Sequence, residues 1–255
     1  MNGLDYRLRE FLPALERRAV LLDASAGLSL GVVPGLEDWG QAVRPALAWL
    51  DGLICSPGQL RRLTNCGRAD AALLVRMDWT NTLRGEGFPL APETATHLAI
   101  LTTSDALELG ATAMVSSLLL GYDETLEAGC VKAMVQLAMA GRDLGLPLIV
   151  DVCPSGPRVA LPDKAVELGA SLALESGADV IGVPYAGSAS LKTIAAMLSV
   201  PWLLKPTTPV AAAREWEEAL GLGAAGLWLD HTWLAPSIGL KQFADRARQA
   251  AATGD

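Results

Sequence analysis

Residues 175–183 read Glu-Ser-Gly-Ala-Asp-Val-Ile-Gly-Val, which joins the end of a predicted helix to an apolar strand through a Gly-Ala step. A glycine directly after a helix is typical of a left-handed C-terminal cap. The same helix–Gly–Ala–strand junction occurs at residues 109–111 and 222–225. Three copies of one junction indicate that the chain repeats a strand–helix unit.

Short apolar runs alternate with predicted helices along the whole chain. Unalternated runs of four or five apolar residues suit parallel strands buried on both faces, and the segments between most of them are long enough for crossover helices. Strands are predicted at residues 19–22, 52–55, 72–75, 113–116, 147–150, 179–183, 201–204 and 225–229. Helices are predicted at residues 123–144, 166–176 and 214–222.

Eight strand–helix units predict an α/β fold, a single (β/α)8 TIM barrel over residues 1–255 with an N-terminal helical extension at residues 1–17. The rival fold is a doubly wound open sheet. It is disfavoured because no Gly-x-Gly-x-x-Gly turn follows a first strand.

Composition excludes several classes of protein. With 51% hydrophobic and 19% charged residues, the chain is not intrinsically disordered. A formal net charge of −8 argues against nucleic acid or an anionic membrane as a partner. There is no apolar run long enough for a membrane helix, no signal-peptide pattern and no Cys-x-x-Cys spacing, so we expect a cytoplasmic protein with reduced thiols.

The C-terminal ends of barrel strands carry the active site, and here they are rich in polar residues. The residues at or just past the predicted strands are Asp23, Ser56, Asp78, Ser116, Ser117, Asp151, Cys153, Tyr185, Lys205, Asp230 and His231. An isolated aspartate or serine there could simply cap the next helix. Together they predict a functional pocket.

Lys205 is the most informative of these residues, because it alone among the five lysines follows an apolar strand and precedes a turn. A lysine held against apolar walls has a lowered pKa, and its neutral amine can form a Schiff base with a carbonyl group. The alternative is a lysine at the rim that pairs with Asp230 or Asp23.

The acidic residues Asp23, Asp78, Asp151 and Asp230 could act as general acids and bases or hold Mg²⁺. No spacing signature supports a metal, and only two histidines are available, so we predict neither a metal nor another cofactor. His231 suits proton transfer, whereas His97 is interpreted as structural. Cys153 is interpreted as a small buried residue or a nucleophile, and Trp233 as packing or an apolar wall of the pocket.

The order and spacing of these segments resemble the class I aldolase family of the archaeal-type fructose-bisphosphate aldolase, a group of DhnA/DeoC-like barrels that includes the autoinducer-2 thiolase. The resemblance runs from about Arg18 to the C-terminal helix. It rests on residues 20–23, 34–37, 51–55, 104–111, 145–148, 177–181 with Tyr185 and Gly187, and 223–226. It implies closed homo-oligomers.

Carried over to this chain, the family's functional residues are mostly replaced. The strand-1 aspartate corresponds to Asp23, but the Schiff-base lysine position holds Gly182 and the tyrosine acid position holds Cys153. The Gly-Gly and Gly-Arg pairs that hold phosphate are replaced by residues 205–206, Lys-Pro, and 230–231, Asp-His. A non-phosphorylated carbonyl substrate is therefore expected, unless the turn at Gly187 and Ser188 binds an anion.

Three hypotheses follow. The first is a diverged aldolase that makes or breaks a C–C bond, or cyclises its substrate, through a Schiff base on Lys205. The second is a non-covalent acid–base isomerase, dehydratase or cyclase in which Lys205 stabilises an oxyanion. The third is an inactive binding or assembly subunit. The predicted catalytic residues are Lys205, Asp23, Asp230, His231 and Asp151; the predicted substrate-binding residues are Asp78, Cys153, Tyr185, Ser188, Ser116 and Trp233.

Overall fold

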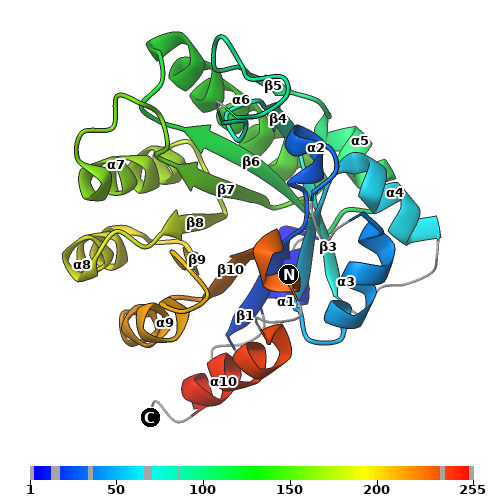
Figure 1. Ribbon diagram of the computed structural model, residues 1–255, viewed down its shortest axis with the longest axis vertical. Helices are drawn as coiled ribbons and strands as arrows, with labels where there is room; N and C mark the ends of the chain where they lie inside the picture. The colour runs from blue at the N-terminus through cyan, green and yellow to red at the C-terminus, as the bar shows by residue number, and fades with distance from the viewer. Residues whose placement is uncertain are drawn as a thin grey trace.

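The computed structural model describes residues 3–12, 18–33, 37–65, 71–85, 87–235 and 239–252. Within these ranges eight parallel strands close into a barrel, in the order β1-β10-β9-β8-β7-β6-β3-β2, and helices surround it (Figure 1). The strands are β1 (Ala19–Asp23), β2 (Gly52–Cys55), β3 (Ala72–Arg76), β6 (Ala113–Leu119), β7 (Leu148–Cys153), β8 (Val180–Pro184), β9 (Trp202–Lys205) and β10 (Gly226–Asp230). The predicted (β/α)8 barrel is confirmed, and every predicted strand overlaps one of these eight.

The helices lie on the outside of the barrel or at its two ends. They are α1 (Gly3–Phe11), α2 (Gly27–Leu30), α3 (Trp39–Leu47), α4 (Pro57–Asn65), α5 (Thr103–Glu108), α6 (Glu124–Leu144), α7 (Pro162–Glu175), α8 (Ser188–Met197), α9 (Ala212–Gly221), α10 (Leu240–Ala252) and the 3₁₀ helix η1 (His231–Leu234). The predictions for α6 and α9 agree closely with the structure. Helix α7 begins earlier than predicted, because Pro162 stands in its first turn, where a missing N–H is tolerated.

The repeated Gly-Ala junction has the same geometry in all three copies. Gly110, Gly177 and Gly223 have φ values of 81°, 90° and 86°, which favour glycine. The N–H of the following alanine donates to a carbonyl five residues earlier, as Ala178 does to Ala173 at 3.1 Å. This is the hydrogen-bond pattern of a Schellman cap, so the junction ends each helix and turns the chain into the next strand.

A short antiparallel hairpin, β4 (Asp78–Thr80) and β5 (His97–Ala99), lies outside the barrel and was not predicted. It is inserted between β3 and α5. Strands of three residues are too short for a hydrophobic period to reveal them. Asp78 therefore belongs to this hairpin rather than to the end of the third barrel strand.

Side chains alternate between the inside of the barrel and its helical coat. The inner cluster includes Leu21, Leu74, Ile149, Leu203 and Trp228. The residues between them pack against the helices in a second, larger cluster. Because the side-chain period of a strand is two, each inner series continues with the residue two positions further on. That residue faces the cavity at the C-terminal end of the barrel.

Helix α1 precedes the barrel, and its Phe11 is fully buried in the inner cluster. Of the predicted extension at residues 1–17, residues 1–2 and 13–17 lie outside the described residues, as do residues 34–36 of the resemblance. Among the helices of the described chain, none is both long and apolar enough to cross a membrane.

Candidate active site at the C-terminal end of the barrel

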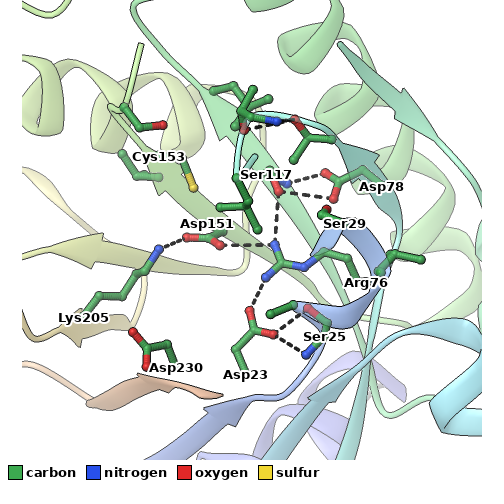
Figure 2. A pocket seen from close by; sticks show the side chains of 18 of the residues that line it. Asp23, Ser25, Ser29, Arg76, Asp78, Ser117, Asp151, Cys153, Lys205 and Asp230 are labelled. Atoms are coloured by element: carbon green, nitrogen blue, oxygen red, sulfur yellow. Dashed lines mark hydrogen bonds and ion pairs between the residues drawn. The ribbon is translucent and has the colours of Figure 1, made fainter. Parts of the chain in front are cut away.

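A cavity of about 530 Å³ opens at the C-terminal ends of the strands. Its floor consists of side chains that continue the inner series of the strands, which include Asp23, Arg76, Asp151 and Lys205 (Figure 2). Asp230 continues the series of β10 and lines the exposed rim of the same cavity. Of the predicted site residues, Asp78, Cys153 and His231 also line the cavity. Seven predicted residues from different strands and loops are thus brought to one place, together with Arg76, which the sequence reasoning missed.

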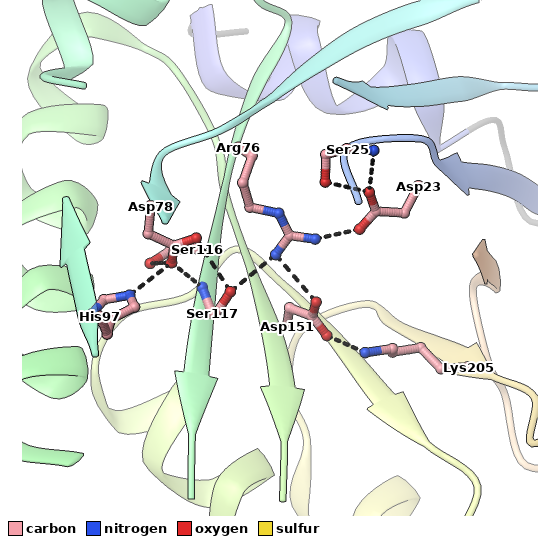
Figure 3. A network of polar contacts seen from close by, with 9 residues as sticks. All are labelled: Asp23, Ser25, Arg76, Asp78, His97, Ser116, Ser117, Asp151 and Lys205. Carbon is pink, nitrogen blue, oxygen red and sulfur yellow. Dashed lines mark hydrogen bonds and ion pairs between the residues drawn. The ribbon is translucent and has the colours of Figure 1, made fainter. Parts of the chain in front are cut away.

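Arg76 lies at the centre of the floor and bridges two carboxylates. Its Nη1 donates to Asp151 Oδ2 and to Ser117 Oγ, both at 3.1 Å, and its Nη2 pairs with Asp23 (Figure 3). Asp23 also accepts from the backbone N–H of Ser25 at 2.9 Å and from its hydroxyl at 2.5 Å. The arginine side chain is only 10% exposed, so the two aspartates are the counter-charges that make its burial possible.

Lys205 forms an ion pair with Asp151, and its Nζ lies 5.4 Å from the centre of the Trp228 ring. Burial disfavours the ammonium form, but neighbouring negative charge, Asp151 first, outweighs it and raises the pKa of Lys205 above its usual value. The expectation of a lowered pKa is therefore wrong, since the walls around the amine are not purely apolar. The alternative interpretation predicted that Lys205 pairs with Asp230 or Asp23. This is also wrong, because its ion-pair partner is Asp151.

Asp151 is the shared anion of the site. Burial would raise the pKa of its carboxyl group, but Lys205 and Arg76 hold that pKa below the ordinary value. Burial and the same carboxylate raise the pKa of the Cys153 thiol to about 12. The thiol is neutral at physiological pH, which favours the interpretation of Cys153 as a lining residue over that of a nucleophile.

Gly182, where the resemblance to the family would place the Schiff-base lysine, follows the inner residue Val180 by two positions and faces the inside of the barrel from β8 with no side chain. A Cβ atom built there would lie 2.5 Å from Cε3 of Trp228, which belongs to β10, two strands away. The Trp228 ring therefore occupies the space that a β8 side chain would need. The ring also contacts the two cations of the site, with Arg76 at 5.7 Å from its centre and Lys205 on the same ring, as expected of cation–π pairs.

Replacing Gly182 with alanine is expected to lower the free energy of unfolding by about 1–3 kcal/mol, because the added methyl group forces the indole ring out of place. Gly129 in α6 provides a matched control, since its Cβ would meet nothing within 4 Å. Gly129→Ala should leave stability unchanged or raise it by about 0.5–1 kcal/mol. Urea unfolding measures both, and equal midpoints for the two variants would contradict the packing described here.

Asp78 connects the hairpin to the barrel. Its Oδ2 lies 3.0 Å from Nε2 of His97 and accepts from the Ser116 hydroxyl at 3.0 Å, and it also accepts from the N–H of Ser117 (Figure 3). Burial opposes protonation of His97, but Asp78 outweighs it and raises the pKa of His97 to about 10, as a close opposite charge does. His97 is therefore an imidazolium at neutral pH that balances the buried charge of Asp78.

Four predicted substrate-binding residues are not brought into the cavity. Ser116 is fully buried behind Asp78, and Tyr185 and Ser188 donate to Glu218 of α9, Tyr185 at 2.7 Å. Trp233 packs against Phe243, with 4.5 Å between ring centroids. The physical reason is strand parity for Ser116 and Tyr185, which stand one residue out of phase with the inner series. Trp233 follows β10 on η1 and points into the helical layer.

Asp230 and His231 lie at the rim of the cavity. Asp230 is exposed, and its Oδ1 accepts from the N–H of Thr232 at 2.8 Å, so it also caps η1. In the part of the chain that the structure describes, no group of three or more His, Cys, Asp or Glu side chains could hold a metal ion.

Comparisons with known proteins agree with the resemblance. No protein-family model matches the chain. A protein from Saccharolobus solfataricus named as an uncharacterized aldolase is 27% identical over 245 residues, covering 89% of this chain and 86% of that protein. The 3-hydroxy-5-phosphonooxypentane-2,4-dione thiolase of Yersinia enterocolitica is 25% identical over 228 residues, covering 88% of this chain and 74% of the thiolase.

Solved structures show the same fold. An archaeal fructose 1,6-bisphosphate aldolase superposes with a TM-score of 0.80 at 21% identity, covering 99% of this chain and all of that chain. A second archaeal fructose-1,6-bisphosphate aldolase, whose catalytic lysine is covalently bound to the carbinolamine intermediate of the substrate, gives a TM-score of 0.76 at 19% identity, over 98% of this chain and all of that one. In sequence and in fold, the chain is thus similar over nearly its whole length to the class I aldolases of the archaeal fructose-bisphosphate type and to the related thiolases.

Proposed function

We propose that this chain is a lyase that makes or breaks a carbon–carbon bond, or cyclises its substrate, through a Schiff base between Lys205 and a non-phosphorylated carbonyl compound. The observation that carries the proposal is the position of Lys205. Among the described residues that line the cavity, Lys205 is the one lysine. Its Nζ contacts the Trp228 ring, which occupies the space that a side chain on β8 would need. An amine from β9 thereby replaces one from the neighbouring strand β8.

Schiff-base formation begins with the loss of a proton from Lys205. The ammonium group releases this proton to solvent while Asp151 holds the amine in place, and the neutral Nζ attacks the carbonyl carbon to form a carbinolamine. The carbinolamine loses water to give an iminium ion, which accepts the electron pair of the bond that breaks. As that bond breaks, a base removes the proton from the hydroxyl group of the departing fragment, which leaves as a carbonyl compound. The resulting enamine is then protonated and hydrolysed to free the amine.

The remaining proton transfers fall to Asp23 on the floor and to Asp230 and His231 at the rim. Asp23 is held in one orientation by Ser25 and Arg76, which suits a group that must meet the substrate at a fixed position. Asp230 and His231 lie where the departing fragment would leave the cavity. Arg76 and the Lys205–Asp151 pair form one connected network with Asp23, so a proton gained at one carboxylate changes the charge felt by the others.

Two observations support a substrate without a phosphate group. The lining contains the carboxylates of Asp23, Asp78, Asp151 and Asp230 against the cations Arg76 and Lys205, with His97 behind Asp78. An excess of acidic groups disfavours a dianion. In addition, the Glu218 carboxylate lies at the start of α8, where it accepts from Ser188 and Tyr185. The turn at the start of α8, which could otherwise have bound an anion, therefore already faces the negative charge of Glu218.

The proposal is tested by reductive trapping and its pH dependence. Borohydride added with a carbonyl compound should attach that compound to the Lys205 peptide. Because the raised pKa keeps the amine protonated at neutral pH, the trapping rate should rise about tenfold per pH unit through roughly pH 7–9 without a plateau. Asp151→Asn removes the largest contribution to that raised pKa, so its pH–rate curve should move to lower pH.

The position of the curve is measured by mass spectrometry of the trapped peptide at fixed times. The expected outcome is a faster trapping rate in Asp151→Asn than in the wild-type protein at each pH from about 7 to 9. Equal rates in the two proteins at every pH would show that Asp151 does not control the amine. Label spread evenly over all five lysines would contradict the proposal itself.

The raised pKa of Lys205 also favours a second candidate function. A stable ammonium ion beside Arg76 would stabilise an oxyanion in a non-covalent isomerase, dehydratase or cyclase. In that case Lys205→Arg would retain most of the activity, whereas Asp23→Asn would lose it. Under the Schiff-base proposal, Lys205→Arg is as inactive as Lys205→Ala, because a guanidinium group does not form an imine.

A further inference from the structure

We infer that the substrate bound over Lys205 carries an apolar alkyl or aryl portion, and is not a polyhydroxylated sugar. The inference rests on the proposed function, in that Lys205 is taken to hold the carbonyl carbon.

The polar groups on the floor are already engaged with one another. Asp151 is shared by Lys205 and Arg76, and Asp23 by Arg76 and Ser25 (Figure 2). Ser117 accepts from Arg76 and donates to Asp78 at 3.2 Å. A chain of sugar hydroxyls would have to compete with these charge-assisted contacts, and each polar group left unpaired in the cavity would weaken binding.

The lining of the cavity also contains five apolar side chains from separate parts of the chain, which together are called the apolar wall. Leu28 and Leu30 belong to α2, Leu83 to the loop after β4, and Leu119 and Pro154 to the ends of β6 and β7. Leu83 is 57% exposed at the mouth of the cavity. A large apolar side chain that remains exposed beside a concave site is the type of residue that a ligand covers.

Arg84 holds this wall in place from outside the cavity. Its Nε donates to the carbonyl oxygen of Ser29 in α2 at 2.8 Å, and its guanidinium group lies 5.5 Å from the Trp79 ring centre and 5.1 Å from that of Phe88. This contact fixes α2 against the loop that carries Leu83. The α2 part and the Leu83 part of the apolar wall are therefore held together as one surface and do not move as two independent loops.

Trapping of a homologous series on Lys205 measures the apolar wall directly. The probes are propanal, butanal, pentanal and hexanal, compared with glyceraldehyde, the dihydroxylated counterpart of propanal. The half-saturating concentration of each probe is expressed as the concentration of its unhydrated aldehyde form. It is measured from the amount of label on the peptide that contains Lys205. Burial of each added methylene group should lower the half-saturating concentration about fourfold until the wall is covered. Glyceraldehyde should be trapped no better than propanal.

Variants locate the effect. Leu83→Asn should raise the half-saturating concentration of hexanal by about tenfold and that of propanal by less, because only the longer chain reaches the mouth. Leu90→Asn is the matched control, since Leu90 is 71% exposed but does not line the cavity. It should leave the whole series unchanged.

The outcomes separate the inference from the proposed function. A flat series, or glyceraldehyde trapped more tightly than hexanal on Lys205, would overturn the inference and leave the Schiff base standing. No label on Lys205 with any aldehyde would overturn the proposed function instead. The apolar wall is then judged by calorimetry of Lys205→Ala, where tighter binding of hexan-1-ol than of glycerol supports the inference and the reverse order refutes it.

Discussion

Replacing Lys205 with alanine is expected to lower kcat/KM for carbon–carbon bond cleavage by at least about a thousandfold, because the variant has no amine in the cavity to form the iminium ion. The loss should appear mainly in kcat. Lys205, which Asp151 holds in place, takes part in the chemical step, so removing the amine changes that step more than it changes substrate affinity. Steady-state kinetics of the wild-type and variant proteins measure the difference.

Lys164→Ala is the matched control for this variant. Lys164 is exposed on α7 and pairs with Glu167 three residues further on, a contact of little energetic weight. The control should keep its activity and its stability. A Lys205→Ala protein that remains folded and retains more than about a tenth of the wild-type activity would contradict a covalent role for the lysine.

Arg76→Met is expected to lower the free energy of unfolding by about 3–5 kcal/mol, because it leaves the carboxylates of Asp23 and Asp151 buried without their shared cation. Methionine is similar in length and apolar, so the change removes the charge while retaining much of the volume. Urea unfolding followed by circular dichroism gives the difference directly.

Arg158→Met provides the comparison on the surface. Arg158 pairs with Glu124 at 3.3 Å, but the two side chains are 60% and 90% exposed. Such pairs contribute about 0–1 kcal/mol, so this variant should unfold close to the wild-type midpoint. Equal losses from Arg76→Met and Arg158→Met would show that the buried network does not stabilise the barrel.

The fold was predictable because the repeated Gly-Ala junction and the apolar runs are local signals. Each junction needs a glycine with positive φ followed by a small buried residue, and that requirement is visible in residues 175–183. The hairpin around Asp78 and His97 was not predictable, since its three-residue strands are held by a buried ion pair between residues far apart in sequence.

The site was predictable only in part, because a residue at the end of a strand faces the cavity only if it is in phase with the inner series of that strand. Arg76 stands two positions after the inner residue Leu74, so the period of two would have identified it. The same rule retains Lys205, two positions after Leu203, and places Tyr185 on the outer face with Val183. The raised pKa of Lys205 could not be foreseen, because its cause, the contact with Asp151, depends on how two strands align.

The most direct test of the Schiff-base proposal is a crystal of the wild-type protein soaked with hexanal and reduced with borohydride. We expect continuous electron density from Nζ of Lys205 to the aldehyde carbon, with the alkyl chain directed toward Leu28 and Leu83. Intact aldehyde in the cavity without a bond to Lys205, or an adduct on another lysine only, would contradict it.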